Sequence, residues 1–144
     1  MKILIGLSLV AVTIIIHAIG TSSWVNYLIN LTREIGFKPF KNWKFFLLIA
    51  GTACILMLLH FIEVALWAIT YMLLPAITEL STFDESMYFS LVTFSSLGYG
   101  DITLGPAWRL LSGIEALNGI VLIGWSTALI FAVVERSIQL KLKK

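Results

Sequence analysis

The chain has 144 residues, of which 59% are hydrophobic and only 12% are charged, with a formal net charge of +2 and a mean hydropathy of +0.96. A soluble domain carries charge at about a quarter of its positions. This composition therefore excludes a soluble globular protein and indicates an integral membrane protein. The single cysteine, Cys54, excludes an intrachain disulfide. No basic run carries interleaved aromatic residues, so the sequence predicts no nucleic-acid surface, and no soluble partner is evident.

The first apolar run covers residues 3–20. A helix needs about 20 apolar residues to cross a bilayer core of about 30 Å, so we predict an N-terminal transmembrane helix over residues 1–22. A cleaved signal peptide is the alternative, because Lys2 precedes the run and the small residues Ala18 and Gly20 close it. The basic segment that follows would then have to be exported, which favours a retained helix.

Residues 23–44 are predicted to form a basic cytoplasmic linker. One helical face is shared by Trp24, Tyr27, Leu28 and Leu31, which is typical of an amphipathic helix in the membrane interface. Continuation of the first span past the membrane is the alternative. We expect the basic side chains of this linker to contact anionic membrane lipids.

Two further apolar runs predict an outer helix over residues 45–74 and an inner helix over residues 108–136, followed by a short basic tail over 137–144. The segment between the two runs is too polar to span a membrane. Its apolar centre, residues 87–97, is too short to cross. Such a segment is typical of a re-entrant helix that enters and leaves on one side.

The re-entrant helix has a clear start in the sequence. Thr82 and Glu85 have the spacing of a capping box, which predicts a short helix over residues 83–95. The fold class expected is therefore an all-α membrane protein with three transmembrane helices and one re-entrant helix.

Orientation is predicted from the basic residues, which favour the cytoplasmic side. They are concentrated in the linker and the tail, whereas the segment before the re-entrant helix is acidic. We expect a multi-pass cell-membrane protein, in a prokaryotic inner membrane, with the N-terminus outside and the C-terminus cytoplasmic. The basic residues are Arg33, Lys38, Lys41, Lys44, Arg136, Lys141, Lys143 and Lys144, and the acidic ones are Glu79, Asp84 and Glu85.

Residues 93–101 read Thr-Phe-Ser-Ser-Leu-Gly-Tyr-Gly-Asp, after a short amphipathic segment and between two spans. This motif resembles the selectivity filter of the potassium-channel pore-domain family, T-x-T-T-V-G-Y-G-D. Serine replaces both later threonines, and Leu97 replaces the valine. The resemblance covers about residues 45–134. It implies one pore loop per chain and a homotetramer, since four loops close one filter.

The resemblance implies that backbone carbonyl groups bind permeating K⁺ in place of its water shell, with no other cofactor or metal. Carbonyl groups aimed at one axis need alternating backbone conformations, so we expect positive φ at Gly98 and Gly100. By resemblance, Tyr99 packs behind the filter and Asp101 lies at its outer mouth. The residues expected to bind K⁺ are Ser96, Leu97, Gly98 and Tyr99, with Gly100 completing the filter, and its support is expected from Thr93, Asp101, Glu115 and Glu63.

The resemblance also assigns roles on the inner helix. Gly119 corresponds to the family's glycine hinge, and Ile120, Ile123 and Thr127 to positions that line the pore cavity. Close packing of helices is the alternative for Gly119, because small residues favour it.

Three ionisable residues fall inside the predicted spans, where a charge costs about 2.5–3.5 kcal/mol. We expect Glu115, with Glu63 and His60, to form a polar cluster behind the filter and supply the brace that Val92 lacks where some family members carry an acid. The alternatives are protonated acids that bond between helices, a metal site of the three residues that lacks a fourth ligand, and pH sensing by His60. His17 is expected to be a packing residue.

Together these features predict a potassium-selective channel subunit that conducts K⁺ passively through a tetrameric pore. A weakly selective cation channel and a non-conducting accessory or scaffold subunit are the alternatives. No nucleophile–base pair or phosphate loop rises above chance, so we expect no enzyme activity. No segment resembles a ligand-binding domain or a voltage sensor. We therefore expect gating to arise within the membrane, or the pore to be a leak.

Overall fold

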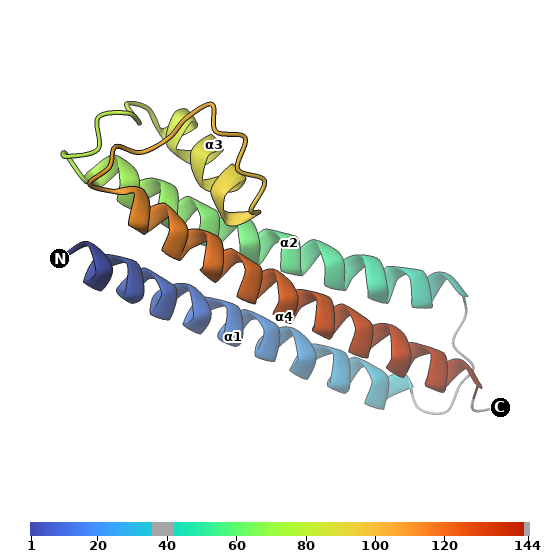
Figure 1. Cartoon of the computed structure of the whole chain (residues 1–144). Helices are drawn as coiled ribbons and strands as arrows, with labels where there is room; N and C mark the ends of the chain where they lie inside the picture. The colour runs from blue at the N-terminus through green and yellow to red at the C-terminus, as the bar shows by residue number, and fades with distance from the viewer. Residues whose placement is uncertain (36–41, 143–144) are drawn as a thin grey trace.

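The computed structural model describes residues 1–35 and 42–142, which form four helices (Figure 1). They are α1 (Lys2–Ile35), α2 (Asn42–Leu73), α3 (Phe83–Phe94) and α4 (Arg109–Leu142). The three long helices run side by side, and α3 lies across one end of α2 and α4 (Figure 1). The N-terminus lies at the end that carries α3, and the described residues contain no strand.

The long helices have the length and composition of membrane spans. The apolar stretches are Lys2–Leu31, Phe46–Leu73 and Arg109–Gln139. α3 has 12 residues, so at about 1.5 Å per residue it reaches only about 18 Å and cannot cross the bilayer core. The prediction of an all-helical membrane protein with three spans is confirmed.

Two helices run further than predicted. α1 continues unbroken through residues 23–35, so this part of the predicted linker extends the first helix and forms no separate interfacial helix. α4 includes residues 137–142 of the predicted tail. Neither stretch contains proline or glycine, the residues that most often end a helix. Four of the basic residues on which the orientation prediction depends lie outside the described residues: Lys38, Lys41, Lys143 and Lys144.

α1 packs tightly on α2 and α4 because glycines lie on its contact face. A Cβ atom added to Gly20 would lie 2.5 Å from Leu59 Cδ2 of α2. A Cβ atom added to Gly6 would lie 2.9 Å from Ile114 Cδ1 of α4. Such close approach between helices is typical of small residues in membrane proteins. The two glycines therefore let α1 approach α2 and α4 closely.

Thr13→Val is expected to loosen α1 from α4. Asn118 Nδ2 donates a hydrogen bond of 2.8 Å to Thr13 Oγ1, and both side chains are buried. Valine cannot accept this bond, so we expect the free energy of unfolding to fall by about 0.6 kcal/mol, the average for hydrogen bonds between membrane helices, and by no more than about 1.7 kcal/mol. Thr70→Val is the matched control, because Thr70 bonds the Leu66 carbonyl of its own helix. Unfolding in mixed micelles measures both, and equal losses would contradict the prediction.

The main apolar core lies where α3 meets α2 and α4. It is built around large buried side chains that include Trp67 and Tyr71 of α2, Phe89 and Phe94 of α3, and Leu111 of α4. The Phe89 ring meets the Tyr71 ring edge-on, with 5.3 Å between centroids. Each fully buried Phe or Leu side chain contributes about 1.5–3 kcal/mol. This core therefore fixes α3 firmly on the two long helices.

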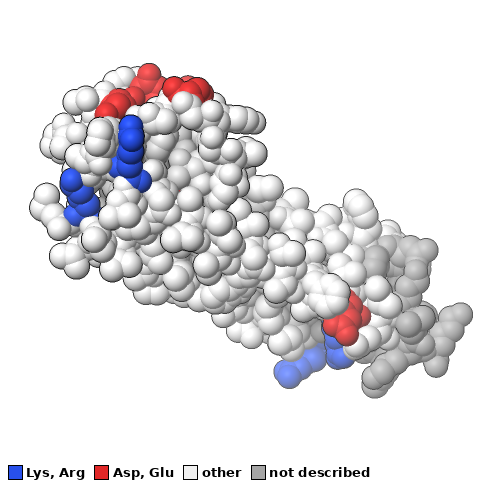
Figure 2. Space-filling model, in the orientation of Figure 1, with Lys and Arg blue, Asp and Glu red and all other residues white. Residues whose placement is uncertain are grey.

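Charged side chains occupy the two ends of the molecule. Figure 2 shows acidic and basic side chains at the end that holds α3, whereas the middle of the helical bundle is uncharged in this view. Lys2 and Arg109 belong to this end, since Lys2 lies over the Trp108 ring and Arg109 begins α4. Glu79, Asp84 and Glu85 lie before and at the start of α3, and Asp101 follows it. An uncharged middle is expected for a surface that faces lipid.

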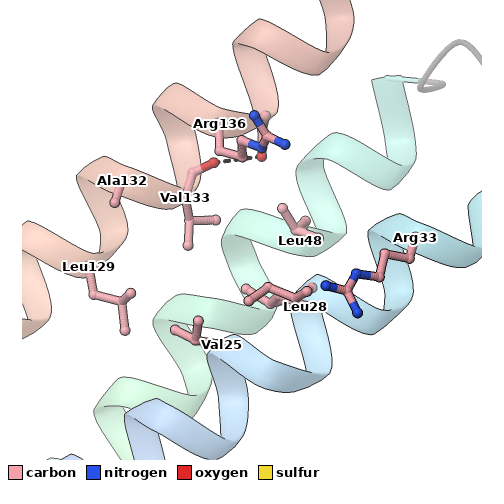
Figure 3. A pocket seen from close by; sticks show the side chains of 10 residues that line it. Val25, Leu28, Arg33, Leu48, Leu129, Ala132, Val133 and Arg136 are labelled. Carbon is pink, nitrogen blue, oxygen red and sulfur yellow. Dashed lines mark hydrogen bonds between the residues drawn. The ribbon is translucent and has the colours of Figure 1, made fainter. Parts of the chain in front are cut away.

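At the opposite end, α1, α2 and α4 enclose a groove with a volume of about 400 Å³ (Figure 3). Its lining is mostly apolar and includes Leu28, Leu48 and Val133, but Arg33 of α1 and Arg136 of α4 also line it. Basic side chains beside an apolar surface at the ends of spans suit the boundary between lipid tails and anionic headgroups.

Candidate functional site

α3 begins with the capping box that the sequence predicted. Thr82 Oγ1 accepts a hydrogen bond of 3.2 Å from the Glu85 N–H, and the Glu85 carboxylate accepts one of 3.1 Å from the Thr82 N–H. The Ser81 hydroxyl also donates to this carboxylate at 2.8 Å. Chiefly because of the Ser81 bond, the pKa of Glu85 lies below its ordinary value. α3 starts at Phe83 and is therefore held at its first turn.

The segment after α3 has an alternating backbone. Ser96, Gly98 and Gly100 have φ angles of +59°, +56° and +77°, whereas Leu97 and Tyr99 between them do not have positive φ. The two glycines adopt this conformation at little steric cost, as expected from the sequence. Ser96 was not expected to do so, and a non-glycine residue in this region is uncommon. The sign of φ therefore alternates from residue to residue over 96–100.

This segment folds back onto the last turn of α3. The Gly98 N–H donates to the Val92 carbonyl at 3.2 Å, and the Ser96 N–H donates to the Thr93 carbonyl at 2.9 Å. Val92 and Thr93 thus support the segment through their backbone. The Tyr99 side chain is 68% exposed. The single chain therefore does not show the predicted packing of Tyr99 behind the filter.

Asp101 is held by a residue of α3 that sequence reasoning missed. The Tyr88 hydroxyl donates a hydrogen bond of 2.6 Å to Asp101 Oδ2. This bond stabilises the carboxylate form and keeps the pKa of Asp101 below its ordinary value. A polar aromatic residue on the short helix before the motif was the available signal.

Tyr88→Phe is expected to make Asp101 easier to protonate. Without the phenol the carboxylate loses its main stabilising bond, so its pKa should rise towards the ordinary value. As pH falls, Asp101 should then lose its charge at a higher pH than in the native chain. A carbon-13 NMR titration of labelled aspartate measures this change. Tyr27→Phe on the exposed face of α1 is the control, and identical titrations of native and Tyr88→Phe chains would contradict the prediction.

Glu115 joins three helices beneath this segment. It is fully buried on α4, and Tyr71 of α2 donates its hydroxyl to Glu115 Oε2 at 2.6 Å. Ser90 of α3 bonds Glu115 Oε1, and its hydroxyl also lies 3.0 Å from the Val64 carbonyl. Buried polar groups that are fully hydrogen-bonded fix one arrangement of the elements they join. Glu115 therefore anchors α3 to both neighbouring spans.

The other two ionisable residues of the predicted cluster lie elsewhere. The two oxygens of the Glu63 carboxyl group lie at hydrogen-bond distance from His17 Nδ1, at 2.8 Å, and from His60 Nδ1, at 2.9 Å. Glu63 and His17 are fully buried. The structure thus separates Glu115 from His60 and Glu63 and adds His17, which sequence reasoning treated as a packing residue. The ligand atoms that lie within 4.8 Å of one another belong to His17, His60 and Glu63, not to the three residues of the predicted metal site.

Gly119 lies against the end of α3. A Cβ atom added to Gly119 would lie only 1.9 Å from the Phe94 carbonyl oxygen. This contact supports close packing as a role of Gly119. The predicted cavity residues of the same helix, Ile120, Ile123 and Thr127, are exposed on the single chain.

A family model described as an ion channel matches residues 43–136, well over half of the chain. The chain belongs to the ion channel family. Comparison with curated proteins and with solved structures found no match.

The match places the functional part of this ion channel chain in α2, α3 and α4. It contains the alternating segment, the Tyr88–Asp101 pair and the Glu115 anchor. α1 lies wholly outside it, yet α1 supplies His17 to the buried group around Glu63. The family is one of channels and not of enzymes.

Proposed function

We propose that the chain is one subunit of a tetrameric, potassium-selective channel. The observation that carries the proposal is the alternation of positive φ at Ser96, Gly98 and Gly100 directly after a short helix. An ion that sheds its water needs several rings of oxygens on one axis, and alternating carbonyl groups from four chains provide them. The oxygens are those of Ser96, Leu97, Gly98 and Tyr99, with the Ser96 hydroxyl adding the innermost ring.

α3 serves as the pore helix in this proposal. Its C-terminal end leads directly into residues 96–101, so four copies would direct the partial negative charge of their helix ends towards an ion in the cavity. Phe94 is buried and Gly119 lies against its carbonyl group. These contacts hold the helix end in place.

The outer mouth and the cavity follow from the same assembly. Asp101, kept ionised by Tyr88, attracts cations at the external side. Ile120, Ile123 and Thr127 of α4 line the cavity below the filter. In this proposal the end with α3 is external and the C-terminus cytoplasmic, because eight of the ten Lys and Arg residues lie in segments 33–44 and 136–144 and basic residues favour the cytoplasm.

Two measurements on the purified chain in lipid vesicles test this proposal. Native mass spectrometry should give an assembly of four chains, and vesicles loaded with potassium should release it when a counter-ion path is supplied. A stable assembly with another number of chains would contradict the proposal. A tetramer that releases no potassium in any lipid would instead favour an accessory or scaffold subunit.

A further inference from the structure

We propose that His17, His60, Glu63 and Ser126 form a proton-binding site inside the membrane. These four residues come from α1, α2 and α4 and are called the four-residue ring below. Glu63 bonds the Nδ1 atoms of His17 and His60 at 2.8 and 2.9 Å. The Ser126 hydroxyl faces the Nε2 atoms of the same two imidazoles, at 3.3 Å from His17 and 2.9 Å from His60.

The hydrogen-bond count of the ring requires one extra proton. Four links join the four residues in a closed circle, and each link holds one proton when it is made. The Ser126 hydroxyl supplies one, and each neutral imidazole supplies one. With Glu63 ionised, the fourth link therefore lacks a proton, and two acceptors face each other without a donor. A single added proton, on an imidazole or on the carboxyl group, completes all four links.

The added proton also removes the net charge of the ring. Glu63 and His17 are fully buried, and an uncompensated charge in such surroundings is costly. With Glu63 ionised and both imidazoles neutral, the ring carries one negative charge. With the extra proton its charge is zero. Hydrogen bonding and desolvation therefore favour the same occupied state.

The described groups packed around the ring bring no other charge. The Trp125 ring of α4 lies edge-on to His17, with 5.5 Å between centroids, and the Phe94 ring of α3 lies 5.8 Å from His60. The two imidazoles stack on each other at 5.3 Å. Glu115, the other buried acid, is bonded to Tyr71 and Ser90. The proton balance of the ring is therefore set by its own four residues.

The geometry fits a proton better than a metal ion. Two ligand atoms on a tetrahedral zinc ion, each at about 2.0–2.1 Å from the metal, lie about 3.3 Å apart. The Glu63 oxygens lie at direct hydrogen-bond distance from both Nδ1 atoms. Ser126 faces the opposite nitrogen of each imidazole, so it cannot complete a metal site with the Nδ1 atoms.

His60 and Ser126 line a groove of about 380 Å³ between α2, α3 and α4, so the ring is not sealed on this side. The His60 side chain is 16% exposed there. Loss of the proton would break one of the four links of the ring, which joins α4 to α1 and α2. In the proposed channel α4 lines the pore, so occupancy of the ring would influence gating; this last step rests on the proposed function.

Nitrogen-15 NMR of the full chain in bilayers, labelled only at histidine, tests the site directly. His17 and His60 are the two histidines of the chain, so all the imidazole signals come from the ring. We expect one of two patterns at neutral pH: three protonated nitrogens and one bare nitrogen, or two neutral imidazoles of opposite tautomers. Raising the pH from about 5 to about 9, the range around the ordinary histidine pKa, should remove at most one proton per chain.

Ser126→Ala should remove this pattern, because two of the four links end at the Ser126 hydroxyl. Ser137→Ala is the matched control, since Ser137 is also buried on α4 but bonds the Val133 carbonyl of its own helix. Two imidazoles of the same neutral tautomer throughout the pH range, or two imidazolium rings at neutral pH, would overturn the proposal. Loss of N–H signals on adding zinc alone would overturn it in favour of a metal site. The signals do not depend on conduction, so a silent channel with the expected pattern would contradict the proposed function alone.

Discussion

Gly119→Ala is expected to destabilise the chain by about 3 kcal/mol, at the upper end of the cost of overpacking a core. The added methyl group would lie 1.9 Å from the Phe94 carbonyl oxygen, 2.7 Å from its carbonyl carbon and 3.0 Å from its Cα. These are backbone atoms, which cannot rotate away as a side chain can. α3 must shift, and in the proposed channel the filter would shift with it. We therefore expect a large loss of potassium flux as well as of stability.

Gly124→Ala is the matched control for this prediction. Gly124 lies on the same helix, and in the single chain a Cβ atom added there has no neighbour within 4 Å. Both substitutions gain about 1 kcal/mol of helix propensity, so the difference between them isolates the clash. Unfolding in mixed micelles measures stability, and vesicle flux measures function. Equal effects of the two substitutions would show that Gly119 does not hold the end of α3.

Glu115→Ala is expected to lower the free energy of unfolding by about 3 kcal/mol and to release α3 from the bundle. The substitution leaves the buried Tyr71 hydroxyl without its acceptor, and a buried unsatisfied group costs about 1–3 kcal/mol. It also removes the contact to Ser90 and leaves a cavity among α2, α3 and α4. The hydrogen-exchange rates of the backbone amides of α3 should rise more than those of α1.

Tyr71→Phe separates the contribution of the hydrogen bond between Tyr71 and Glu115 from the contribution of all the Glu115 contacts. It removes one hydrogen bond but keeps the aromatic packing on Phe89 and the bond between Glu115 and Ser90. We expect a loss of about 1 kcal/mol, the net value of a typical hydrogen bond. Should Glu115→Ala cost no more than Tyr71→Phe, Glu115 would not act as an anchor of α3.

Local features of the fold could be predicted because they depend on neighbouring residues. The apolar runs have the length of spans, and the Thr82–Glu85 capping box depends on residues three apart. Positive φ at Gly98 and Gly100 follows from the freedom of glycine. The sequence left open whether the first span continues past residue 22, because hydropathy marks where a span leaves the membrane and not where a helix stops; α1 continues to Ile35.

Contacts between distant residues could not be predicted in the same way. His17 bonds Glu63 from 46 residues away, and Ser126 faces His17 from 109 residues away. Which faces of α1, α2 and α4 meet depends on their packing, which periodicity in strongly apolar helices does not reveal. For this reason Glu115 was grouped with Glu63 and His60, whereas it bonds Tyr71 and Ser90.

The reversal potential across a bilayer that contains the purified chain, with potassium on one side and sodium on the other, tests the central claim most directly. If Ser96, Leu97, Gly98 and Tyr99 bind dehydrated potassium as proposed, the current should reverse close to the potassium equilibrium potential. A robust current that reverses near zero would contradict potassium selectivity and show that Leu97 and the two serines give a weakly selective cation pore.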